Sequence, residues 1–131
     1  MSIKIPYDTV RETIQQAFLN VGLTEEQAKT CAAIHAQSSA DGVESHGLNR
    51  VPRFVDYVRR GLIDPKGSPE LVRARGAVEN YDGHLGIGIT NALFCADRAM
   101  ELAKEHGIGC VALKNTSHWM RGGTYAWRMA E

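Results

Sequence analysis

The sequence has little of what marks nucleic-acid-binding or membrane proteins. Fifteen basic and fifteen acidic residues give the 131-residue chain a formal net charge of zero. A neutral chain lacks the broad basic surface that binds nucleic acid or anionic membranes. No apolar run approaches the roughly 18 to 20 residues of a membrane-spanning helix. We therefore expect no nucleic-acid or membrane partner, and a globular fold, since 44% of the residues are hydrophobic.

Cysteine is also scarce, with three residues at positions 31, 95 and 110 and no CxxC spacing. An odd, scattered set predicts reduced thiols and a cytoplasmic protein. Cys31 and His35 are one helical turn apart, which is a possible metal-ligand spacing. No second pair completes such a site, so the pattern predicts packing residues and no metal.

The first half of the chain has the apolar spacing of three helices, over residues 7–22, 24–42 and 49–61. Asp8 is the expected N-cap of the first helix, and Thr24 opens a capping box at the second. These helices form a predicted N-terminal helical region over residues 1–64.

The second half, residues 65–131, has a different pattern. Residues 71–83 predict a β-hairpin, and residues 90–107 predict a helix capped by Thr90 or Asn91. The continuous apolar run at 108–115 predicts a strand buried on both faces, followed by a loop and a helix from about Thr124. A helix, strand, loop and helix in this order are typical of an α/β fold.

The first motif that suggests chemistry is "SHGLNR" at residues 45–50. It places His46 just before the third helix and Arg50 at that helix's start. An imidazole and a guanidinium together form a proton donor and a bidentate carboxylate clamp. The alternative is a histidine in a turn beside an exposed arginine, and the spacing alone leaves both open.

The second motif, "SHWMRGG", places His118 and Arg121 in the loop after the predicted buried strand. Ligands of α/β sheets bind beyond the carboxyl ends of strands. Gly122 and Gly123 would let a ligand approach the backbone, and the helix start at Thr124 would favour an anion. The alternative is a glycine turn whose bulky neighbours fill the core.

The stretch "GHLGIGIT" contains Gly86 and Gly88 and resembles a dinucleotide-binding fingerprint only in part. That fingerprint needs a third glycine at position 91, where this chain has Asn91. We therefore expect these glycines to shape the entry to the next helix.

Residues 40–54, "ADGVESHGLNRVPRF", and 106–127, "HGIGCVALKNTSHWMRGGTYAW", resemble the malate/L-lactate dehydrogenase-like family, which is unrelated to the Rossmann-type lactate and malate dehydrogenases. The resemblance covers nearly the whole chain. Within the family, the motifs are most similar to those of the branch that reduces 2,3-diketo-L-gulonate.

The resemblance implies a non-Rossmann α/β fold with a mixed sheet, a homodimer, and hydride transfer between NAD(H) or NADP(H) and a 2-keto or 2-hydroxy acid. It implies that His46 is the proton donor. The expected substrate-binding residues are Ser45, Arg50, His118 and Arg121, and the expected cofactor-binding residues are Gly122, Gly123 and Thr124.

Family members are more than twice as long as this chain, so we expect an N-terminal portion of a longer protein with an incomplete cofactor site. Two alternatives stay open. The substrate could instead be malate, lactate, ureidoglycolate or a cyclic imino acid. The isolated chain could also be a non-catalytic fragment or an interaction module.

Overall fold

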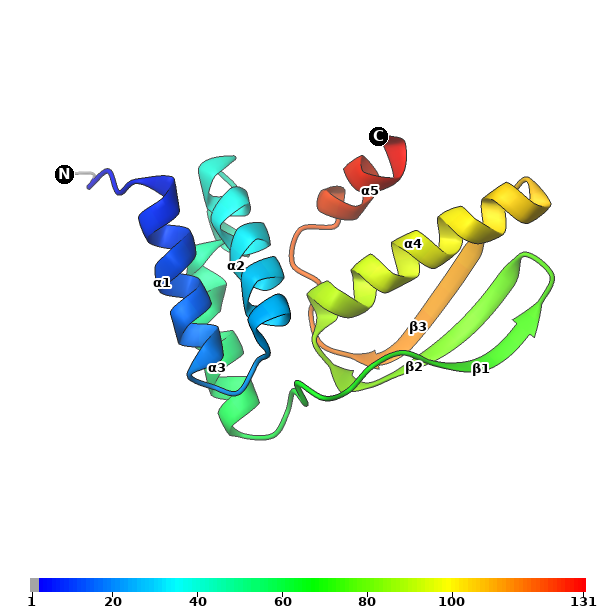
Figure 1. Ribbon diagram of the computed structural model, residues 1–131, viewed down its shortest axis with the longest axis horizontal. Helices are drawn as coiled ribbons and strands as arrows, with labels where there is room; N and C mark the ends of the chain where they lie inside the picture. Colours follow the sequence, from blue (N-terminus) through cyan, green and yellow to red (C-terminus); the bar gives the residue numbers. More distant parts are fainter. Residues whose placement is uncertain (1–2) are drawn as a thin grey trace. The chain divides into compact units, whose positions relative to one another are not determined.

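The computed structural model describes residues 3–131, and the chain divides into two compact units, Met1–Gly61 and Leu62–Glu131. The first unit contains helices α1 (Tyr7–Leu19), α2 (Glu25–Ala40) and α3 (Val51–Arg59), with short 3-10 turns η1 (Glu44–His46) and η2 (Leu48–Arg50). The second contains β1 (Glu70–Arg75), β2 (Val78–Gly86), α4 (Gly88–His106), β3 (Cys110–Thr116) and α5 (Gly123–Ala130) (Figure 1). The predicted α/β class is confirmed. Over the described residues, no helix is both long and apolar enough to cross a bilayer.

The helical unit is built on the contact between α1 and α2, with α3 adding an aromatic side chain. Phe18 of α1 is fully buried, and its ring lies 4.8 Å from that of Phe54 and 5.5 Å from that of His35. Cys31 and His35 are both 0% exposed, which confirms the predicted packing role. Burial raises the pKa of Cys31 to about 12, so this thiol stays protonated.

Of the N-caps predicted for α1, α2 and α4, the one at α2 is confirmed and the other two are wrong. The capping box of Thr24 is present at the start of α2. Asp8 is not a cap, because α1 already begins at Tyr7 and Asp8 lies in its first turn. Thr90 and Asn91 are not caps either, because α4 begins at Gly88. The hydroxyl of Ser117 accepts a 2.8 Å hydrogen bond from the Gly88 N–H, so a distant segment satisfies this helix start.

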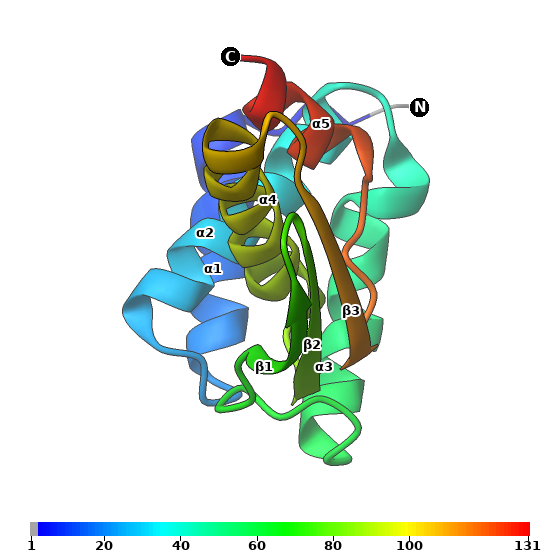
Figure 2. The same ribbon diagram turned by 90° about the vertical axis from the view of Figure 1, so that its right-hand side faces the viewer.

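The sheet of the second unit has the order β1-β2-β3 and is mixed. Strands β1 and β2 form the predicted antiparallel hairpin, with a turn at Gly76, whose φ is +50°. Strand β3 pairs with β2 in parallel after the crossover through α4. Figure 2 shows α4 lying along one face of the sheet.

The prediction that β3 is buried on both faces is wrong. Its residues alternate between exposed and half-buried, because β3 is an edge strand of this sheet and α4 covers one face. A continuous apolar run therefore does not distinguish a central strand from an edge strand.

Gly86 and Gly88 of the stretch "GHLGIGIT" lie where β2 ends and α4 begins, at the helix entry that the sequence predicts for them. A Cβ on Gly86 would lie 2.3 Å from the Gly67 carbonyl oxygen, and one on Gly88 would lie 2.2 Å from the Ser117 carbonyl oxygen. Both residues are glycine because other backbone segments approach them, and no dinucleotide is needed to explain them.

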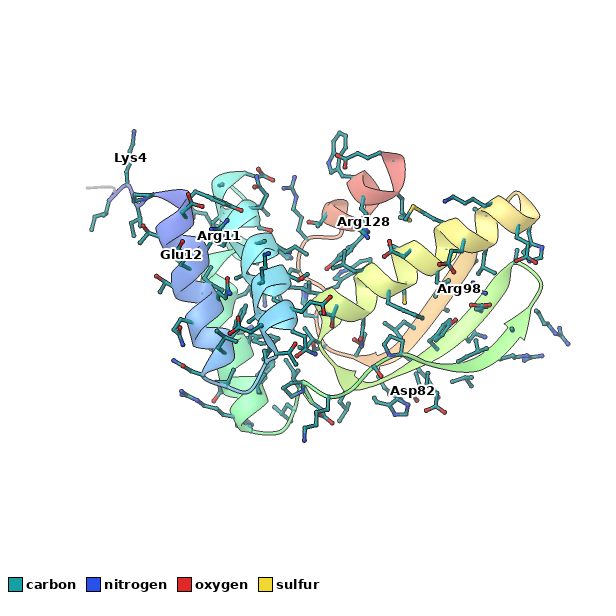
Figure 3. All side chains as sticks on the ribbon, viewed as in Figure 1. Lys4, Arg11, Glu12, Asp82, Arg98 and Arg128 are labelled. Carbon is teal, nitrogen blue, oxygen red and sulfur yellow. The ribbon has the colours of Figure 1, made fainter. Side chains whose placement is uncertain are left out.

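Helix α4 is joined to the sheet by an ion pair whose carboxylate is buried and whose arginine is partly exposed. Glu79 of β2 is 5% exposed, and its carboxylate accepts hydrogen bonds of 2.8 and 2.7 Å from Nε and Nη2 of Arg98. The Tyr81 hydroxyl donates to the same carboxylate at 2.7 Å. The bonds from Arg98, and then that from Tyr81, lower the pKa of Glu79 to about 2. Figure 3 shows Arg98 between α4 and the strands.

Replacing Arg98 by Met should lower the free energy of unfolding by more than loss of an exposed pair does, because it leaves the Glu79 carboxylate, which is 5% exposed, without its cation. The matched control is Arg128→Met, which removes an exposed pair with Asp97 at 2.8 Å and should cost less than about 1 kcal/mol. Urea denaturation of both variants measures the difference. Equal losses would show that the pair of Glu79 and Arg98 has no special importance.

The depressed pKa of Glu79 also predicts acid sensitivity. A carboxyl group with a lower pKa in the folded state stabilises the fold above its unfolded pKa, and the contribution is lost as the pH falls. The free energy of unfolding should therefore fall between pH about 4.5 and about 2. Other carboxylates contribute to this fall, but it should be smaller in Glu79→Gln, which cannot take up the proton. A Glu79→Gln variant with an unchanged pH slope would contradict the assignment.

Candidate active site

The first group of predicted site residues lies in the loop between α2 and α3. Nδ1 of His46 is 2.8 Å from the Ser45 hydroxyl. Arg50, at the N-cap of α3, donates from Nε to the Ser45 carbonyl oxygen at 2.8 Å. The structure therefore brings Ser45, His46 and Arg50 together in one loop, with Ser45 bonded to both of the others.

Helix α2 holds the next peptide of this loop through two side chains. The His35 ring is 3.0 Å from the Gly47 carbonyl oxygen through Nδ1, and the Ser39 hydroxyl accepts the Leu48 N–H at 2.8 Å. A Cβ on Gly47 would lie 2.1 Å from the Ser39 hydroxyl oxygen. Only glycine at position 47 permits this approach, so the glycine of the motif has a local structural reason.

The second group lies in the second unit, in the loop between β3 and α5. Nδ1 of His118 accepts a 2.9 Å hydrogen bond from the Met120 N–H. Met120 adopts a φ of +66° and is 6% exposed, so its side chain fills the core while the loop turns. The Trp119 and Tyr125 rings stack at 5.4 Å, and the Tyr125 hydroxyl donates to the Trp119 carbonyl oxygen. These contacts hold His118 just beyond the carboxyl end of β3, where the sequence predicts it.

The predicted cofactor-binding residues form the start of α5. Gly122 is its N-cap residue, and a Cβ there would lie 3.3 Å from the Trp119 ring. A Cβ on Gly123 would make only an ordinary contact of 3.7 Å with Arg121 Nε. The Thr124 N–H donates to the Arg121 carbonyl oxygen at 3.1 Å. That N–H is used inside the turn, so the Thr124 hydroxyl is the group with which this residue would contact an anion.

A cleft of about 560 Å³ opens in the second unit beside His118. Apolar side chains of α4, β3 and α5 form most of its wall, among them Ala96, Leu113 and Met129. Polar groups gather where β3 ends, at Thr116, Ser117 and His118. An apolar cavity with a few polar groups at one end is typical of a small-molecule site.

The predicted residues thus fall into two groups, each assembled within its own unit. Sequence reasoning missed Ser39 and Ser117, and it assigned His35 to packing alone. All three bind backbone groups far along the chain, and the sequence carries no signal for such contacts. Within residues 3–131, no three His, Cys, Asp or Glu side chains gather as metal ligands.

Curated proteins similar to this chain are reductases of a diketo sugar acid. The 2,3-diketo-L-gulonate reductase of Klebsiella pneumoniae (strain 342) is 43% identical over 129 residues, covering 98% of this chain and 39% of that protein. The 2,3-diketo-L-gulonate reductase of Haemophilus influenzae is 41% identical over the same shares. The chain therefore spans about two fifths of the length of these relatives.

Solved structures show the same fold. The malate dehydrogenase of Pyrococcus horikoshii OT3 matches with a TM-score of 0.92 at 30% identity, over 96% of this chain and 36% of that one. The sulfolactate dehydrogenase of Methanocaldococcus jannaschii matches with a TM-score of 0.90 at 28% identity, over 96% and 37%. The sequence profile of the malate/L-lactate dehydrogenase family matches residues 5–131. The chain belongs to the malate/L-lactate dehydrogenase family.

Proposed function

We propose that this chain supplies the proton donor and the carboxylate anchor of an NAD(P)H-dependent 2-keto acid reductase. The substrate is a sugar acid like 2,3-diketo-L-gulonate. The observation that carries the proposal is the Ser45, His46 and Arg50 constellation in a chain of this family. The similarity to 2,3-diketo-L-gulonate reductases supports the substrate class.

The cofactor of the proposal is NAD or NADP, whose reduced form, when bound, would supply the hydride that reduces the keto carbon. The residues of this chain that would hold it are Gly122, Gly123 and Thr124, at the N-terminus of α5. Helix N-termini favour phosphate groups because their N–H groups and dipole point toward the anion. Gly86 and Gly88 do not take part, since both are closely covered by backbone.

His46 has the hydrogen-bond partner that a proton donor needs. The Ser45 hydroxyl can accept from Nδ1–H of His46. The imidazolium then keeps this bond and gives its Nε2 proton to the developing alkoxide. The neutral ring that remains still carries Nδ1–H and still donates to Ser45. Proton transfer from Nε2 therefore leaves the hydrogen bond between Nδ1–H of His46 and the Ser45 hydroxyl in place.

The hydrogen bond at Nδ1 of His118 runs in the opposite direction. Its Nδ1 accepts the Met120 N–H, and a backbone N–H cannot accept in return. Because Nδ1 accepts this hydrogen bond, the hydrogen of the neutral ring lies on Nε2. His118 therefore acts as a hydrogen-bond donor toward the carbonyl oxygen or a hydroxyl of the substrate, and His46 is the better proton donor.

Arg50 is the carboxylate anchor. Its Nε–H is directed at the Ser45 carbonyl oxygen, which fixes the plane of the guanidinium. The other four N–H donors lie on Nη1 and Nη2 and can form paired bonds to a carboxylate. Arg121 is proposed as a second cation for the same substrate group. The homodimer and the cytoplasmic location remain proposals, the latter supported by three free cysteines.

A related possibility keeps the reaction and changes the substrate to malate, lactate, ureidoglycolate or a cyclic imino acid. Structural similarity to a malate dehydrogenase and a sulfolactate dehydrogenase favours testing other acids. The chain should be assayed with NADH and NADPH against a panel of 2-keto acids. It should be assayed alone and as a chimera in which it replaces the matching residues of the Klebsiella reductase. If the isolated chain is a non-catalytic fragment, only the chimera turns over, whereas tight NADH binding by the chain alone would contradict an incomplete cofactor site.

In the chimera, His46→Ala should lower kcat by roughly 100-fold or more, the usual contribution of a general acid. Loss of reduced-nicotinamide absorbance with the best keto acid measures the rate. The control is His106→Ala, which alters a histidine in the last turn of α4 and should leave kcat unchanged. A His46→Ala chimera with unaltered turnover would transfer the acid role to another group.

The tautomers of two histidines provide a test that needs no activity. In ¹⁵N spectra of the chain, His118 should show a protonated Nε2 and a bare Nδ1. His35 is an internal control of opposite form, because its Nδ1 faces the Gly47 carbonyl oxygen and must carry the hydrogen. A protonated Nδ1 on His118 would exclude the donor role derived from the Met120 contact.

A further inference from the structure

We propose that His35 and Ser39 act together as a clamp, here called the α2 clamp, that positions the proton donor His46. Both are positioning residues, because they touch the backbone next to His46 and no reacting atom. The inference rests on the proposed function for its catalytic consequence. Its structural part concerns the helical unit alone and can be tested separately.

The α2 clamp holds the two ends of one peptide group. The carbonyl of Gly47 and the N–H of Leu48 belong to the same planar unit. His35 donates to the carbonyl oxygen at 3.0 Å, and Ser39 accepts the N–H at 2.8 Å. The two side chains are four residues apart and therefore lie on one face of α2. Rotating the peptide plane would break both bonds at once, so the clamp selects one orientation.

The chemical identity of His35 is not explained by packing. Its side chain is 0% exposed, and its Nε2 has no hydrogen-bond partner within residues 3–131. Leaving a buried nitrogen unpaired costs free energy that a phenylalanine in the same space would not incur. What the imidazole adds is the Nδ1–H that reaches Gly47. Burial lowers the pKa of His35, so the ring stays neutral in the form that the clamp needs.

The clamp acts directly beside the catalytic ring. Arg50 holds the carbonyl of Ser45, which precedes His46, and the clamp holds the peptide that follows Gly47. The backbone of His46 is therefore fixed on both sides. A displacement of a catalytic group by about 1 Å can lower the rate by about 100-fold, so this restraint matters for turnover.

The structural test uses amide hydrogen exchange in the 131-residue chain. Ser39→Ala should speed exchange of the Leu48 N–H by roughly tenfold, since a lost hydrogen bond of this kind is worth about 1 kcal/mol or more. The matched control is Ser38→Ala, on the same helix, whose hydroxyl donates to the Ile34 carbonyl oxygen within α2 at 2.9 Å. Unchanged Leu48 exchange in Ser39→Ala would overturn the clamp.

The catalytic test uses the chimera and compares three substitutions. His35→Phe and Ser39→Ala should each lower kcat by roughly tenfold with a smaller change in KM, because the acid is displaced while other groups still bind substrate. Their double variant should lose less than the product of the single losses, since each breaks the same restraint. His35→Asn should recover much of kcat, because its side-chain N–H can take the place of Nδ1–H. A His35→Phe chimera as active as the parent, or an Asn variant no better than Phe, would overturn the proposal.

The outcomes separate the clamp from the proposed function. A parent chimera that reduces no keto acid contradicts the proposed function, while Leu48 exchange in the chain still decides the clamp. If His35→Phe fails to fold, Ser39→Ala provides both readouts, because Ser39 is only half-buried.

Discussion

The hydrogen bond between Ser45 and His46 is the interaction on which the proposed chemistry of the helical unit depends. A histidine gives up a proton efficiently when one nitrogen faces the substrate and the other keeps its partner in both charge states. A hydroxyl beside Nδ1 meets that condition, and a backbone N–H beside Nδ1 does not. The same residue type therefore has two different abilities in this chain. The two rings differ in the group beside Nδ1, which is the Ser45 hydroxyl for His46 and the Met120 N–H for His118.

The rest of the helical unit fixes the backbone of the loop that carries Ser45 and His46. The apolar packing of Phe18 against Phe54 joins α1 to α3, and α2 carries polar side chains toward the loop between α2 and α3. In the second unit the restraint is ionic. The ion pair of Glu79 and Arg98 fixes α4 to the sheet, and Ser117 links the start of α4 to the end of β3. Each unit thus uses a few buried polar contacts to set the position of a loop.

The order of helices and strands could be predicted because it depends on local periodicity, capping and turn residues. The capping box at Thr24 and the hairpin over residues 71–83 each depend on residues close together in the sequence, and both are present. Asp8 fails as a cap because α1 already begins at Tyr7, whereas the failures at Asn91 and β3 share a cause. Each depends on partners distant in sequence, such as Ser117 at the start of α4 or the lack of a further paired strand beside β3 among the described residues. Likewise, the motif around His46 could be found from its residue types, whereas its support by α2 involves a backbone peptide that no residue pattern identifies.

Asn91 shows that completing a sequence motif can conflict with the contacts of the fold. Its amide donates to the Gly83 carbonyl oxygen at 3.4 Å and to the Thr116 hydroxyl at 3.0 Å, so it joins the end of β2 to the end of β3 from inside α4. A glycine at this position would give the sequence all three glycines of the dinucleotide-binding fingerprint. It would also remove the cross-link that holds the two strand ends together. In this chain, completing the glycine pattern of a cofactor motif would remove part of the framework that supports the loop of His118.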